Sequence, residues 1–165
     1  MIDLTERPVQ AEYAGFWLRF VAHLIDNLVL SVPFAIIIIP FFLFTGFFDF
    51  THNFKSMDQE EQKIAMTGIF MGAIIIAILA NGIIGWLYYA LMESSSRQAT
   101  VGKLVLGLKV TDINGDRISF GRATGRYFGK ALSNLTLHIG YMMAGFTEKK
   151  QALHDIIADC LVVKK

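Results

Sequence analysis

Residues 16–44 read FWLRFVAHLIDNLVLSVPFAIIIIPFFLF, and this stretch decides the class of the protein. As a helix the run is long enough to cross a hydrocarbon core of about 30 Å. Arg19 and Asp26 interrupt it, and charges at bilayer depth face protein or water because lipid contact is costly. Their spacing of seven residues is two helical turns, so both side chains lie on one face, with His23 between them. The pattern predicts a membrane helix with a polar stripe directed toward other helices.

The composition agrees with one small membrane domain. The chain has 165 residues, of which 54% are hydrophobic and 18% are charged. The net charge of +1 gives no support for a nucleic-acid partner. Cys160 is the single cysteine, which excludes an intrachain disulfide. Residues 1–14 form a polar arm without the basic start of a cleavable signal, so we expect the first apolar run to stay as an anchor.

A second apolar segment, residues 64–92, predicts a second membrane helix. We expect Pro33 and Pro40 to kink or end the first helix, and residues 46–63 to form a polar loop. Gly68 and Gly72 form a GxxxG pair in the second segment, and small residues continue from it at steps of four. Such residues let helices approach closely in lipid. Packing of a helical hairpin is favoured over dimerisation, and Asn81 is expected to donate a hydrogen bond toward the stripe.

Residues 94–126 are polar and predict a small β-hairpin at the membrane surface. Leu106–Val110 and Arg117–Phe120 flank Asn114-Gly115, a strong signal for a two-residue hairpin turn. We expect Cys160–Val163 to add a third strand. The segment QATVGK at 98–103 lacks the leading glycine and the final Ser or Thr of a phosphate-binding loop, so it is not interpreted as one.

The charges between the apolar segments predict the orientation. Six basic residues lie in loop 94–126 and two in loop 46–63, which places the larger loop and the N-terminus in the cytoplasm of a bacterial plasma membrane. Residues 127–146 predict a third helix, either amphipathic or embedded in the membrane. The tail, residues 147–165, carries four lysines, so two spans with a cytoplasmic tail agree better with the charge bias than three spans.

The chain resembles the RDD family of small membrane proteins. The resemblance rests on AGFWLRFVAHLIDNLVL, on YALMESSSRQATVGKLVLGLKVTDINGDRISFGRATGR and on QALHDIIADCLVV, in this order. It implies that Arg19, Asp26 and Asp155 are the arginine and the two aspartates for which the family is named. It also implies an involvement in transport, since some members are proposed to be cation/proton antiporters. Ala158-Asp159-Cys160 replaces the usual glycine-rich close of the family pattern.

Two functions therefore stay open for an α-helical membrane protein with a helical hairpin and a small cytoplasmic sheet. One is an ion- or proton-coupled transporter that acts as an oligomer, with a cation or proton as its ligand. The other is a non-transporting accessory protein that assembles with its own copies or with a larger membrane partner, and whose charged stripe is structural. The sequence predicts no enzyme, no cofactor and no metal site. The candidate charge cluster comprises Arg19, His23, Asp26, Asn81 and Asp155.

Overall fold

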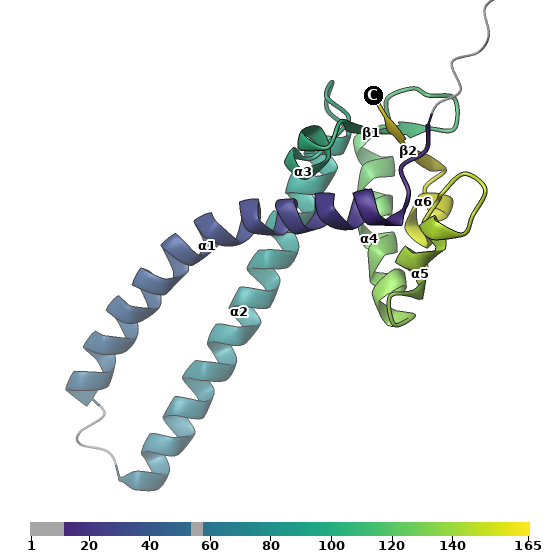
Figure 1. Cartoon of the computed structure of the whole chain (residues 1–165). Helices are drawn as coiled ribbons and strands as arrows, with labels where there is room; N and C mark the ends of the chain where they lie inside the picture. The colour runs from purple at the N-terminus through teal and green to yellow at the C-terminus, as the bar shows by residue number, and fades with distance from the viewer. Residues whose placement is uncertain (1–11, 54–57) are drawn as a thin grey trace, which may run out of the picture. The chain divides into compact units, whose positions relative to one another are not determined.

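The computed structural model describes residues 12–53 and 58–165, which form two compact units. The first, here called the mixed unit, contains residues up to Asp26 together with Trp86–Lys165. The second, the helical unit, is Asn27–Gly85. Helices α1 (Phe16–Asn53) and α2 (Gln59–Glu93) each run from one unit into the other (Figure 1). The chain is mostly helical, as the sequence predicts.

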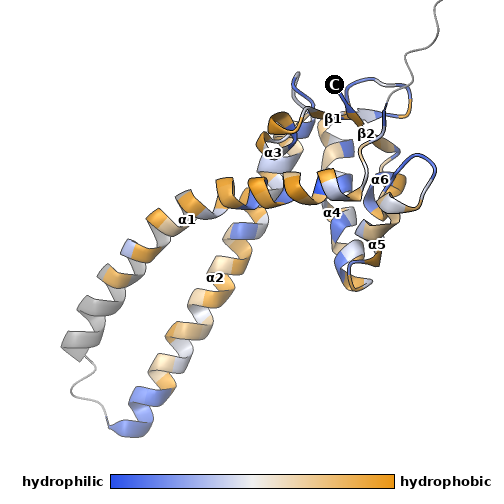
Figure 2. Cartoon of the chain, viewed as in Figure 1, coloured by the Kyte–Doolittle hydropathy of each residue, from blue (hydrophilic) through white to orange (hydrophobic). Residues whose placement is uncertain are grey.

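Helix α2 is long and apolar enough to cross a membrane, and 6% of its apolar window is buried. Figure 2 shows it largely in the colours of hydrophobic residues beyond its hydrophilic first turns. Two expectations for this region are wrong, namely that a proline ends the first helix and that residues 46–63 form a loop. Helix α1 continues past Pro33 and Pro40, and residues 46–53 and 59–63 are helical, so the predicted polar loop 46–63 is mostly helix. Residues 54–57 of that loop lie outside the described residues.

The glycine pair of α2 makes no close contact with another helix among the side chains that the structure describes. Among the described residues, no atom outside the local helix lies within 4 Å of a Cβ built at Gly68 or at Gly72. The interpretation of Gly68 and Gly72 as a close contact inside a helical hairpin is therefore not supported by these contacts. Small residues contribute to helix packing only where another helix enters the groove that they leave.

The sheet of the mixed unit differs from the predicted hairpin. Strand β1 (Leu108–Asp112) pairs antiparallel with β2 (Cys160–Lys164), with Val110 opposite Val162. The N-terminal arm lies along the other edge of β2, where the Ala14 amide donates to the Val162 carbonyl at 2.8 Å. The C-terminal strand thus lies between two segments, which stabilises a sheet that would be marginal with two strands.

The predicted partner strand, residues 117–120, is wrong, because residues 117–119 are irregular and a helix starts at Phe120. The turn at Asn114-Gly115 forms, with Gly115 at φ +90° and the Asp112 carboxylate accepting from the amides of Asn114 and Asp116. Ser119 then caps α4 (Phe120–Leu135) by accepting from the Arg122 amide. A side-chain cap satisfies an amide that would otherwise lack a partner at the helix start, and this favours a helix over a returning strand.

The third helical region is shorter and divided. Helix α4 ends at Leu135, and α5 (Ile139–Met142) and the 3₁₀ turn η2 (Met143–Gly145) follow it. The helix predicted at 127–146 therefore starts earlier and stops within that range. At about 24 Å by helical rise, α4 is shorter than a hydrocarbon core. It is amphipathic, and it buries Ala123, Arg126, Gly129 and Ser133 on one face.

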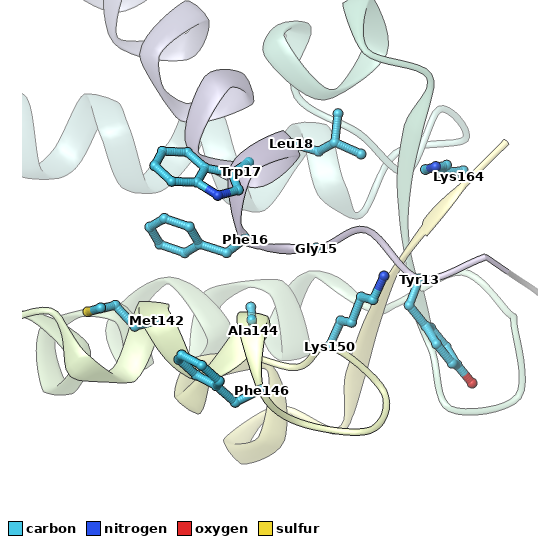
Figure 3. Close-up of a pocket in the computed structure, with 11 residues that line it drawn as sticks. Tyr13, Gly15, Phe16, Trp17, Leu18, Met142, Ala144, Phe146, Lys150 and Lys164 are labelled. Carbon is cyan, nitrogen blue, oxygen red and sulfur yellow. The ribbon is translucent and has the colours of Figure 1, made fainter.

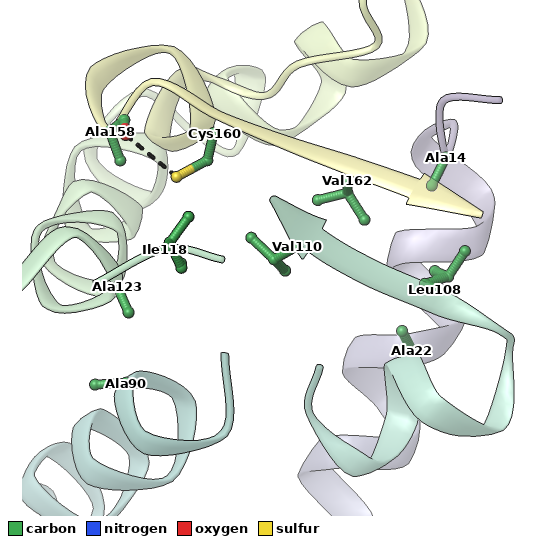
Figure 4. Close-up of a cluster of buried hydrophobic side chains, with 10 residues drawn as sticks. All are labelled: Ala14, Ala22, Ala90, Leu108, Val110, Ile118, Ala123, Ala158, Cys160 and Val162. Carbon is green, nitrogen blue, oxygen red and sulfur yellow. Dashed lines mark hydrogen bonds between the residues drawn. The ribbon is translucent and has the colours of Figure 1, made fainter. Parts of the chain in front are cut away.

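Small side chains make the core of the mixed unit, where α3 (Val101–Val105) and α6 (Leu153–Ile157) also pack. Figure 4 shows Val110, Val162 and Ile118 from the sheet region beside alanines of the helices. The thiol of Cys160 is buried in this core and donates to the Ala158 carbonyl at 3.2 Å. Burial raises the pKa of Cys160 to about 11. Small residues allow helix backbones to approach closely, which brings their polar groups within reach of each other.

Candidate functional site

A buried network of five charged side chains lies within the mixed unit. It joins α1, α2, α3, α4 and α6, and we call it the charge cluster: Arg19, Glu93, Lys103, Arg126 and Asp155. Glu93, Arg126 and Asp155 are almost wholly buried. Burying charges is costly unless they are paired and hydrogen-bonded, so the geometry of these pairs decides whether the cluster is stable.

Arg126 is the centre of the cluster. Its Nη1 donates to Glu93 Oε2 at 2.6 Å, while Nε and Nη2 approach Asp155 Oδ1 at 2.8 and 2.7 Å. Burial by itself would lower the pKa of Arg126, but the carboxylates of Glu93 and Asp155 raise it above the ordinary value. One guanidinium therefore links the end of α2 to α6 through α4.

Arg19 and Lys103 complete the pairing of the two carboxylates. Arg19 Nη1 pairs with Asp155 Oδ2, and Lys103 Nζ pairs with Glu93 Oε1. Burial would raise the pKa of Asp155, but Arg126 and Arg19 hold it well below its usual range. The other nitrogens of Arg19 donate to the carbonyls of Ala14 and Lys150, at 2.7 and 2.6 Å. These bonds fix the start of α1 against the chain that leads into α6.

Asp26 forms a separate site in the mixed unit. Its Oδ1 accepts from the Tyr88 hydroxyl and from the Gly102 amide, both at 2.7 Å, and its Oδ2 accepts from Thr100 Oγ1 at 2.7 Å. An added Cβ at Gly102 would stand 2.0 Å from the Ala22 carbonyl oxygen, so only glycine allows this approach. The segment that resembles an incomplete phosphate loop thus binds a carboxylate of its own chain.

A third group of polar side chains surrounds Tyr89. The Lys130 ammonium lies 3.6 Å from the centre of the Tyr89 ring, and His23 Nδ1 lies 3.0 Å from the Tyr89 hydroxyl. Among the residues that the structure describes, no carboxylate lies within ion-pair distance of Lys130. Burial lowers the pKa of Lys130 to about 7; Glu93 opposes this shift, and Lys103 and Arg126 add to it. A cation over an aromatic face is attracted by the ring quadrupole.

His154 is also buried, and it packs against α4. An added Cβ at Gly129 would lie 3.2 Å from His154 Cβ, so that glycine makes room for α6. Burial lowers the pKa of His154 to about 3, against the opposing effect of Asp155, so the imidazole is neutral at pH 7. Within residues 12–53 and 58–165, no group of three or more His, Cys, Asp or Glu side chains could hold a metal ion.

The structure brings together some of the predicted residues and separates others. Arg19 and Asp155 pair directly, whereas Asp26 and His23 bind other partners. Asn81, which the sequence predicts to donate toward the stripe, donates through its amide to the Ala77 carbonyl of its own helix at 2.9 Å. Sequence reasoning missed the following partners: Glu93, Lys103, Arg126, Lys130, Tyr88 and Thr100. Most of them lie after the second apolar segment. The sequence predicts an exposed polar loop there, so charged residues in it give no sign that they are buried.

Helix α2 has the length and the apolar composition that a membrane-crossing helix needs. The RDD family model matches residues 13–159, and the chain belongs to this family.

Two proteins of Bacillus subtilis (strain 168) are similar over nearly the whole chain. The uncharacterized protein YxaI is 42% identical over 154 residues, which cover 92% of this chain and 97% of YxaI. The uncharacterized membrane protein YteJ is 32% identical over 167 residues, which cover 94% of this chain and 87% of YteJ. No solved structure matches the chain significantly.

Proposed function

We propose that the chain is a non-transporting protein of the bacterial plasma membrane, and that its charge cluster is structural. In this proposal α1 and α2 cross the bilayer, and the N-terminus and the mixed unit are cytoplasmic. Three observations support this location: the apolar length of α2, the family, and the description of YteJ as a membrane protein. The basic residues of 94–126 support the orientation.

One observation carries the structural role of the cluster. Every buried polar side-chain atom of the described residues has a hydrogen-bond partner within the protein. A transport site must exchange its ligand with water, which requires carboxylates that can be opened to solvent. Glu93, Asp155 and Asp26 are closed instead by donors from their own chain. Such a network holds elements that are distant in the sequence in one arrangement.

The exposed apolar surface of α2 supports assembly in the membrane. Ile69, Phe70, Ile76 and Leu79 are each about three-fifths or more exposed in the single chain, with Gly68 and Gly72 in the same segment. Lipid can cover such side chains, and small residues additionally permit a close helix contact. We propose a larger membrane protein as the partner, and a second copy of this chain is the alternative outcome of the test.

The test is ion flux in proteoliposomes, with the intact protein and the variant Asp26→Asn. The protein is reconstituted at equal folded amounts, and proton, Na⁺ and K⁺ gradients are imposed. If the charge cluster and the Asp26 site are both structural, neither form gives a flux above that of protein-free vesicles. Flux by the parent protein that Asp26→Asn abolishes, while the variant stays folded, would overturn the proposal. A second experiment identifies the partner. Ile76 is replaced by Cys in a chain whose Cys160 is replaced by Ser, and the new thiol is cross-linked in the membrane. The mass of the adduct then distinguishes a second copy of the chain from a larger partner.

One feature favours proton-coupled transport as the second candidate. Lys130 lies over Tyr89 without a carboxylate partner among the described residues, and His23 contacts the same tyrosine. A half-buried lysine whose pKa is lowered to about 7 changes its charge in the physiological range. In this case Lys130→Met abolishes a proton flux that Lys149→Met, at an exposed lysine, leaves intact. Absence of flux in the parent protein removes this candidate.

A further inference from the structure

A groove opens in the mixed unit beside the start of α1. Its volume is about 570 Å³, within the range of about 300–1,000 Å³ that is usual for small-molecule sites. The walls come from the N-terminal arm, the first turn of α1, the α5–η2 segment and the end of β2, and the principal side chains are Phe16, Trp17, Met142, Phe146, Lys150 and Lys164. No residue of the charge cluster lines it.

The groove is amphipathic along its length. Figure 3 shows Phe16, Trp17, Met142 and Phe146 at one end and Lys164 at the other, with the Lys150 side chain reaching toward the lysine end. Trp17 and Phe146 are 73% and 86% exposed, a large area for aromatic side chains to leave in water. Trp at the membrane–water interface lies at the level of the head groups.

The charged end has a cation available. Lys164 pairs with Glu12, whereas Lys150 forms no ion pair with any described residue. The Lys150 side chain lies beside Gly15, where an added Cβ would stand 3.7 Å from Lys150 Cδ, an ordinary contact distance. The backbone of Lys150 is fixed independently, because its carbonyl accepts from Arg19 Nη2. With Glu12 included, the two lysines leave one net positive charge at this end.

We propose that this groove binds an anionic phospholipid, with the head-group phosphate at Lys150 and the upper acyl chain along Phe16, Trp17 and Phe146. Charge complementarity at one end and apolar walls at the other select this ligand over a free phosphate, which would leave the aromatic end in water. The inference rests on the membrane location of the proposed function, and it is independent of whether the protein transports ions.

The experiment uses Trp17 as its reporter. The chain has two tryptophans, and Trp86→Phe leaves Trp17 alone. The full-length variant is reconstituted in phosphatidylcholine vesicles that contain, at equal mole fraction, either brominated phosphatidylglycerol or brominated phosphatidylcholine. Bromine quenches tryptophan on contact, so the ratio of the two quenching values measures head-group preference. We expect the anionic lipid to quench more strongly.

Lys150→Gln should lower this ratio by roughly fivefold, the factor that corresponds to about 1 kcal/mol per lysine at a membrane surface. The matched control is Lys149→Gln, the adjacent exposed lysine, which does not line the groove and should leave the ratio near that of the parent. Added glycerol phosphate should not relieve the quenching.

Three results would overturn the inference. Equal quenching by both lipids would mean that Trp17 contacts bulk lipid without selection. An equal fall of the quenching ratio in Lys149→Gln and Lys150→Gln would mean that surface charge in general attracts the anionic lipid. Relief of quenching by glycerol phosphate would mean that the ligand is a soluble phosphate. Absence of quenching by either lipid would instead contradict the membrane location itself, so the two failures are distinguishable.

Discussion

At the scale of single residues, the pairing of Arg126 with two carboxylates explains how so many charges are buried in so small a unit. Arg126 binds Glu93 and Asp155, which belong to α2 and α6. Their attraction offsets desolvation only while all partners are present, since loss of one partner leaves a buried charge unpaired. The same reasoning applies to Asp26, whose three donors come from α2, α3 and the residue before α3.

We predict that Arg126→Met destabilises the protein by about 3–5 kcal/mol, because Glu93 and Asp155 then lose their shared partner. The measurement is thermal or denaturant unfolding of the purified protein in detergent. Arg122→Met is the control on the same helix, since Arg122 is partly exposed and lies 3.7 Å from Asp112. It should cost less than about 1 kcal/mol. Equal losses in the two variants would contradict the central role of Arg126.

We predict that the protein is less stable at pH 5 than at pH 7, in part because of His154. Its pKa is lowered to about 3 in the folded chain, against about 6.5 in an unfolded one. The unfolded chain therefore takes up the proton first, so this contribution is complete above pH 6.5 and is lost as the pH falls toward 3. Asp155, whose pKa is lowered, contributes to acid sensitivity only below about pH 4.

Melting temperatures at the two pH values test this prediction. His154→Gln should reduce the difference between them, and His138→Gln, at an exposed position, should leave it unchanged. A difference that is the same in the parent and in His154→Gln would show that other groups are responsible.

At the scale of elements, the position of β2 distinguishes this fold from a simple hairpin. Strand β2 pairs with β1 on one edge and accepts the N-terminal arm on the other. The two ends of the described chain thus meet in one sheet, directly beside the first turn of α1. This arrangement places the start of α1 where Arg19 reaches Asp155.

We predict that a cysteine pair at Val110 and Val162 forms a disulfide on mild oxidation, in a chain whose Cys160 is replaced by Ser. The two residues lie directly opposite each other, and the Cα separation of such pairs is within the range of disulfides. A hairpin closed at Asn114-Gly115 would instead place Val110 opposite Ser119. The control pair, Val110→Cys with Ser119→Cys, should stay reduced when thiols are counted by mass spectrometry. If only the control pair forms a disulfide, the pairing of β1 with β2 is contradicted and the predicted hairpin is favoured instead.

At the scale of the whole molecule, the proposed topology places both ends of the chain on the cytoplasmic side. Cys160 is unsuitable as a reporter because it is buried, and it is therefore replaced by Ser. We predict that Asp58→Cys reacts with a membrane-impermeant thiol reagent in intact cells. Lys165→Cys should react only after the cells are opened. Both positions are exposed in the structure. Reaction of Lys165→Cys from outside would require a third span and would contradict the two-span topology.

The sequence by itself determined the class of protein, the family and the two long apolar helices. These features depend on local composition, on helical periodicity and on the order of motifs, which are visible without contacts. Through the family resemblance it also named Arg19 and Asp155 among the three family residues, and the structure pairs these two, whereas Asp26, on the same helical face as Arg19, binds Tyr88, Thr100 and Gly102. Asp26 was recognised as polar and buried for the same local reason, its position inside an apolar run.

Only the tertiary structure decided which charges pair and which strands meet. Glu93, Lys103 and Arg126 lie in polar stretches whose composition is the same whether they face water or a buried partner, and their partners are 10 to 33 residues away. The strand opposite Val110 was likewise decided by packing, because Ser119 caps a helix where the local turn signal favoured a returning strand. Ion pairing and strand pairing are contacts between distant residues, and their energies depend on burial that the folded chain alone creates.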